Sequence, residues 1–139
     1  MSWITDRIAE RKAAQDRKAL IFSEGENVFA ALWVAILALT KEATANGFPV
    51  HTNGSPHARA VAYTPPGDFQ RQLEISLHRE EGEIIAQGPD GNIKLLLDVG
   101  TDGVVGLKTT GPWLSLEQAA REILDPFLFP DLAKKTFPR

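Results

Sequence analysis

The sequence predicts an α+β protein, and three observations support this class. Residues 28–39 form an unbroken apolar run, VFAALWVAILAL, whose four alanines favour a helix over a strand. Between residues 47 and 110, apolar and polar residues alternate, as in strands with one solvated face. Ser115 and Gln118 then form the capping box of a last helix. We expect two N-terminal helices with the second fully buried, an antiparallel meander of five to six strands, and a C-terminal helix.

The 139 residues match the usual size of one domain, so we expect a single unit. Its expected parts are a charged first helix (1–22), a buried helix (23–46), an antiparallel sheet (47–110), and a C-terminal helix and tail (115–139).

Residues 3–20 predict the first helix, which has only a thin apolar stripe. Ile4, Ile8 and Ala9 lie on one helical face, and charged side chains cover the rest. Five basic and three acidic residues give this segment a charge of +2. Because the net charge of the whole chain is −3, the remaining residues carry −5. We expect a solvated face over the core. The alternative is a helix that packs on a second subunit or binds an acidic partner.

The second helix is expected to run from about Glu24 to about Ala45. Ser23 and Glu26 have the spacing of a capping box at its start, and Asn46-Gly47 provides a left-handed stop. A helix that is apolar all round must be buried all round. We therefore expect a sheet on one side and helices or a second subunit on the other.

Short loops connect the predicted strands, which favours an antiparallel meander. The expected strands are residues 48–52, 57–64, 69–79, 83–87, 93–99 and 104–109. Gly111-Pro112 is expected to end the sheet. The C-terminal helix should stop near Leu124, because Asp125-Pro126 follows, and residues 127–129 should form an apolar clip.

Composition excludes several classes of function. The net charge of −3 and the pI of about 5.6 argue against a nucleic-acid-binding protein. The chain has no cysteine, so disulfides, thiolate catalysis and cysteine-bound zinc are excluded. We find no secretory signal pattern, and charge closes the apolar run too early for a membrane span. We therefore expect a cytoplasmic protein.

One candidate ligand site depends on strand register. If the Pro65–Asp68 turn places His57 opposite His78, one solvated sheet face carries five candidate residues. These are His57, Arg59, Tyr63, Glu74 and His78, with His51 close by. Histidines on adjacent strands can bind zinc, and an arginine can bind a carboxylate or phosphate. Solvated histidines and a cross-strand ion pair are the simpler interpretations, so we predict no catalytic residue, metal or cofactor.

The leading functional hypothesis is a small non-enzymatic association domain that forms a homodimer. Its basis is the apolar surface expected from residues 28–39, Trp3, Trp113 and residues 127–129, which is more than one small core can cover. The alternative is a small-molecule or metal-binding protein, with a hydrolytic role included, that uses the outer sheet face. An unknown protein partner that binds the first helix is a further hypothesis.

Overall fold

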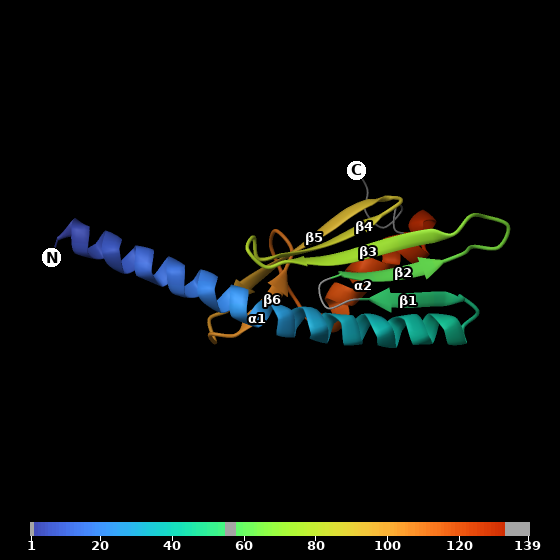
Figure 1. Cartoon of the computed structure of the whole chain (residues 1–139), viewed down its shortest axis with the longest axis horizontal. Helices are drawn as coiled ribbons and strands as arrows, with labels where there is room; N and C mark the ends of the chain where they lie inside the picture. The colour runs from blue at the N-terminus through green and yellow to red at the C-terminus, as the bar shows by residue number, and fades with distance from the viewer. Residues whose placement is uncertain (1, 55–57, 133–139) are drawn as a thin grey trace.

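The computed structural model describes residues 2–54 and 58–132, which form one long helix, a seven-stranded sheet and a second helix. The elements are α1 (Trp3–Ala45), β1 (Val50–Gly54), β2 (Ala58–Tyr63), β3 (Arg71–His78), β4 (Glu83–Gly88), β5 (Gly91–Val99), β6 (Val105–Lys108), β7 (Trp113–Leu114) and α2 (Leu116–Leu128). The α+β class and the antiparallel sheet are confirmed. In Figure 1 the N-terminal part of α1 extends beyond the sheet, and its C-terminal part runs beneath the strands.

The prediction of two N-terminal helices is wrong, because α1 is continuous for 43 residues. Its N-cap is Ser2, whose side chain accepts a hydrogen bond from the Ile4 amide. Ser23 does not cap a second helix. Its hydroxyl donates to the Leu20 carbonyl at 3.1 Å, a bond that a serine can make inside a helix. The predicted end of the helix is confirmed at Asn46 and Gly47.

Gly25 lies in the interior of α1 and allows the helix to approach the sheet closely. It is fully buried. A Cβ atom built on it would lie 3.4 Å from Leu97 Cδ1 and 3.8 Å from Leu77 Cδ1. In the sequence, Gly25 belongs to a segment that resembles the start of a helix. In the structure it is an interior residue of α1 that packs against the sheet. The space left around it is enough for one methyl group but not for a longer side chain.

The seven strands follow one another in space in the order of the chain, and all neighbouring pairs are antiparallel. The expected count of five to six strands is wrong, because the sheet also contains the short strand β7. Gly111-Pro112 does not end the sheet but turns it, since the Thr109 amide donates to the Pro112 carbonyl at 3.3 Å. Lys108 then pairs with Trp113 and Leu107 with Leu114.

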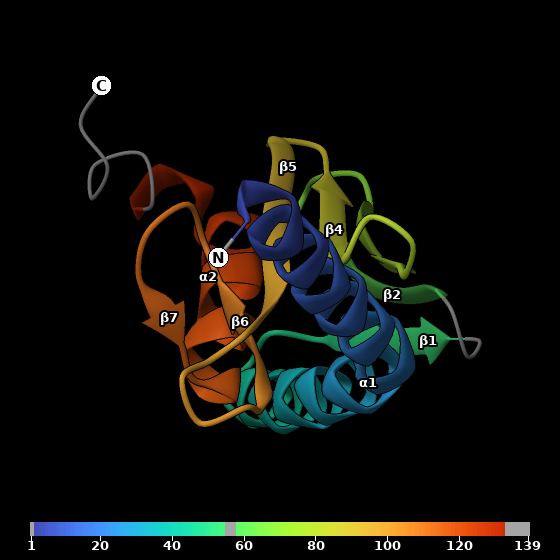
Figure 2. The same cartoon turned by 90° about the vertical axis from the view of Figure 1, so that its left-hand side faces the viewer.

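The core lies between one face of the sheet and the two helices (Figure 2). Helix α1 packs against α2 and against β1, β3, β5 and β6, while α2 covers β5, β6 and β7. The largest fully buried side chains are Leu32, Ile36, Val61, Ile75, Ile84, Leu95, Leu107 and Ile123. Their alternation along the strands leaves the other sheet face to solvent.

Helix α2 confirms its predicted capping box and corrects its predicted end. Ser115 Oγ accepts from the Gln118 amide, and Gln118 Oε1 accepts from the Ser115 amide. The helix continues through Pro126 to Leu128, and residues 130–132 begin a further helical turn. Phe127 is buried, which explains the continuation: the predicted clip lies on the helix and packs into the core. The remainder of the predicted tail, residues 133–139, lies outside the described residues.

We predict that Gly25→Ala raises the free energy of unfolding by about 0.5–1 kcal/mol, because alanine is the better helix former and its methyl group fits without a clash. Gly25→Leu should lower it by about 1–3 kcal/mol, because the longer side chain would collide with Leu97. Urea denaturation measures both changes. A destabilised alanine variant would show that the helix and the sheet are closer than we describe.

Candidate functional site

The five predicted ligand-binding residues do not share one sheet face. In the structure Arg59 pairs with Ile75 and Tyr63 with Arg71, one residue away from the predicted register. Arg59 and Tyr63 therefore point to the helix-covered side, whereas Glu74 and His78 lie on the solvent side. His57 lies outside the described residues.

His78 and its neighbours form an ordinary solvated strand surface. The His78 ring nitrogen Nε2 lies 3.1 Å from Ser76 Oγ, and both residues face away from the helices. His51 also lies on this face, two strands away, because it pairs with Ala62. No three His, Asp or Glu side chains are grouped as metal ligands within residues 2–54 and 58–132. Ligand binding by the predicted residues stays a prediction. The four of them that the structure describes lie on two opposite faces of the sheet.

Arg59 contacts aromatic side chains of α1, whereas the predicted register placed it on the solvated sheet face. Its guanidinium carbon lies 5.6 Å from the Phe29 ring and 5.7 Å from the Trp33 ring, both on α1. Its Nε atom is buried and makes no hydrogen bond to the described part of the chain. The cation therefore holds β2 against α1 through the two aromatic faces. Val61 and Tyr63 could have indicated this register, because large apolar residues belong on the buried face.

Helix α1 is not buried all round, so that prediction is wrong. Leu32 and Ile36 are fully buried, but Val34 is 66% exposed and Leu37 37% exposed on the opposite side. Ala30 and Ala38 are exposed beside them. We call Ala30, Val34, Leu37 and Ala38 the uncovered row of α1. The sheet and α2 cover one side of the apolar run and leave this row to water.

The N-terminal turns of α1 project beyond the body as an arm (Figure 1), and the base of this arm contacts the body through Arg17. Residues 2–19 are all exposed, including Trp3 at 73% and Ile8 at 62%. Two ion pairs within the helix support the arm locally. They join Arg7 to Glu10 at 2.9 Å and Lys12 to Asp16 at 3.3 Å. Such exposed pairs add little stability.

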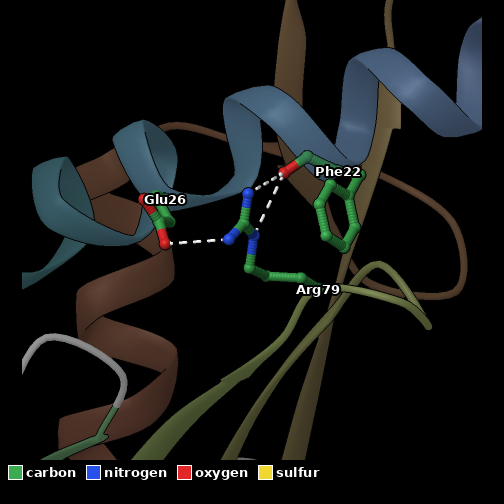
Figure 3. A network of polar contacts seen from close by, with 3 residues as sticks. All are labelled: Phe22, Glu26 and Arg79. Atoms are coloured by element: carbon green, nitrogen blue, oxygen red, sulfur yellow. Dashed lines mark hydrogen bonds and ion pairs between the residues drawn. The ribbon is translucent and has the colours of Figure 1, made fainter.

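Arg79 anchors α1 where the arm leaves the body (Figure 3). Its guanidinium carbon lies 4.1 Å from the centre of the Phe22 ring. Nε and Nη2 donate to the Phe22 carbonyl at 3.3 and 3.1 Å, and Nη1 contacts Glu26 Oε1 at 3.0 Å. One side chain from the end of β3 therefore binds the ring, the backbone and a carboxylate of α1.

Asp98 on β5 makes a second connection to the base of the arm. Its carboxylate lies 2.8 Å from Lys108 Nζ on β6 and 3.5 Å from Arg17 Nε on α1. The hydrogen bond from Lys108 is the main reason that the pKa of Asp98 is lower than its ordinary value. The Val99 amide and Arg17 act in the same direction, and partial burial opposes them.

A groove of about 650 Å³ lies between the C-terminal half of α1 and α2, at the end opposite the arm. Half-buried apolar side chains line it, and among these Phe48 and Phe129 meet edge to face with centroids 5.2 Å apart. Its charged lining residues are Glu42, Arg121, Glu122 and Asp125. Sequence reasoning missed this groove, because it forms only when two helices 70 residues apart in the chain pack side by side.

By length and composition alone, α1 is a helix that could cross a membrane, and only 22% of its most apolar stretch is fully buried. The comparisons with known proteins do not assign the chain to a class. No family model, curated protein or solved structure matches it. The function proposed below is therefore inferred from the fold and the surface of this chain alone.

We predict that Arg79→Met lowers the free energy of unfolding by about 1–2 kcal/mol, because it removes the cation over Phe22 and the bonds to the carbonyl. Arg79→Lys should cost less, since it keeps the charge near Glu26. Urea denaturation compares the three chains. Equal midpoints for the methionine variant and the natural chain would contradict the anchoring role.

Acid should weaken the connection at Asp98. Because its pKa is lowered in the folded state, the stabilisation is complete above the unfolded pKa and is lost as pH falls below about 4. Asp98→Asn should therefore cost about 0.5–1 kcal/mol near pH 6 and less near pH 3. Thermal unfolding of both chains across this range measures the difference. A difference in stability between the two chains that does not change with pH would contradict the stabilising role of the Asp98 carboxylate.

Proposed function

We propose that this chain is a non-enzymatic association domain that works as a homodimer, with α1 in the interface. The observation that supports it most directly is the uncovered row of α1, together with the exposed apolar side chains of the arm. Apolar side chains grouped on one side of a helix usually mark a surface that another molecule covers. The outer sheet face offers no comparable observation for the small-molecule alternative.

A protein partner suits α1 better than a lipid bilayer. The opposite side of the same helix supplies Phe29, Leu32 and Ile36 to the core. A helix inserted into a membrane would remove these residues from the sheet and expose the sheet face that they cover. A partner that docks on the uncovered row leaves the fold intact.

A second copy of the chain is the partner that the charges favour. The segment 3–20 carries +2, while the rest of the chain carries −5, since the total is −3. Two copies can therefore place the basic arm of each against the acidic body of the other. Electrostatic complementarity of this kind assists association and orients the two molecules.

Replacing Val34 and Leu37 together with glutamate should raise the dimer dissociation constant by about a hundred-fold, because both charges would be buried at the centre of the interface. Both side chains are exposed in the single chain, so its fold should persist. Sedimentation equilibrium at micromolar concentrations measures the association, and circular dichroism verifies the fold.

Phe69→Glu is the matched control. This residue is 88% exposed in the connection between β2 and β3 and is not part of α1, so the variant should dimerise like the natural chain. A natural chain that is monomeric at high micromolar concentration would end the proposal.

A further inference from the structure

We infer that the arm of α1 is a lid that bends at Ser23 and closes against the body, and that Arg79 is the latch that holds it open. The lid closes a cleft of about 720 Å³ between the base of the arm and the turn that joins β3 to β4. Side chains of residues 10–21 form the helix wall of this cleft, and residues 79–82 with Leu97 form the opposite wall. The inference does not rest on the proposed homodimer, because the lid works within a single chain.

The two walls of the cleft carry opposite net charge. The charged side chains of the helix wall are Glu10, Arg17 and Lys18, and those of the opposite wall are Arg79, Glu80 and Glu81. Two basic residues against one acidic residue give the helix wall a charge of +1, and the reverse count gives the opposite wall −1. Electrostatic attraction therefore favours closure of the arm onto the turn.

Closure requires few contacts of the open form to break. The ion pair between Arg17 and Asp98, at 3.5 Å, already joins the base of the arm to the body and can remain as the arm tilts. Ala13 and Ala14 lie on the helix wall and are exposed, so their short side chains permit a close approach of the arm to the turn. The remaining arm residues up to position 19 are exposed as well.

The bend falls at Ser23, because residues 23–26 have the pattern of a helix start inside a continuous helix. Ser23 and Glu26 have the spacing of a capping box. In the continuous helix neither side chain caps, because the Ser23 hydroxyl donates to the Leu20 carbonyl at 3.1 Å and Glu26 contacts Arg79 at 3.0 Å. When the helix restarts at Ser23, both side chains can take capping roles, which offsets part of the backbone bonding that the bend breaks.

Arg79 opposes the bend because it binds residues on both sides of the break (Figure 3). Before the break, its guanidinium stacks on the Phe22 ring, and Nε and Nη2 donate to the Phe22 carbonyl. After the break, Nη1 donates to the Glu26 carboxylate and so competes with the Ser23 amide for that group. Loss of Arg79 frees the carboxylate for capping and lets the arm turn toward the cleft.

A distance measurement along α1 tests the lid. The natural chain has no cysteine, so Ala9→Cys and Lys41→Cys provide two sites for spin labels, both exposed and outside the cleft lining. Position 41 follows position 9 by 32 residues, which is about 48 Å in a straight helix, and any bend shortens this distance. Double electron–electron resonance, with labelled chains in a large excess of unlabelled chain, measures the distance within one molecule.

The natural chain should give mainly the long distance. Arg79→Met should raise the share of chains with a shorter distance about ten-fold, because the open form loses the latch. Lys94→Met is the matched control and should leave the distribution unchanged. It removes an ion pair to Glu83, at 3.5 Å, on the sheet face that is turned away from the helices. An Arg79→Met chain with the natural distribution would overturn the inference.

Two further changes test the break point and the cleft in the Arg79→Met chain. Ser23→Ala should return the short population to near its natural share, because alanine cannot cap the restarted helix. Glu80→Lys with Glu81→Lys should do the same, because lysines would then repel the basic residues of the helix wall. A short population that persists after either change would overturn the lid as described.

Ser23→Asp in the natural chain gives an independent test if circular dichroism shows that Arg79→Met does not fold. Aspartate is a strong N-cap, so this variant should also raise the share of short distances while Arg79 stays in place. A distribution equal to that of the natural chain would contradict a break point at Ser23.

Discussion

The structure depends on one constraint: a single sheet face can cover only one side of an apolar helix. The sheet and α2 enclose Leu32 and Ile36, but they leave Val34 and Leu37 at the surface. The open side of α1 has no further element of the described chain to cover it. The function proposed for this protein starts from that remaining apolar surface, because no family model, curated protein or solved structure matches the chain.

Tertiary contacts explain why α1 passes through a segment that resembles a helix start. Ser23, Gly25 and Glu26 would suit an N-terminus in isolation. In the folded chain, Gly25 packs under Leu97, and Arg79 binds Glu26 and the Phe22 carbonyl. These contacts use the same residues for attachment to the sheet, so the helix continues into the arm.

Much of the architecture was predictable because it follows from local patterns. The α+β class, the antiparallel meander, the end of α1 and the Ser115–Gln118 capping box all follow from periodicity, short loops and cap chemistry. The candidate site was not predictable, because it required one strand register. The connection between Tyr63 and Arg71 has seven residues and is not a tight turn. The register that it sets places Arg59 on the buried face, one residue away from the predicted pairing. The groove was also beyond local reasoning, since it depends on how two distant helices pack.

The sequential strand order has a consequence for how this protein avoids aggregation. A meander that does not close leaves β1 and β7 as its two edges. The edge at β7 offers only two residues for pairing and follows a proline, while β1 ends at Asn53-Gly54 and also follows a proline. Short edges flanked by proline are poor templates for adding a foreign strand. Growth of the sheet into fibrils is thereby discouraged.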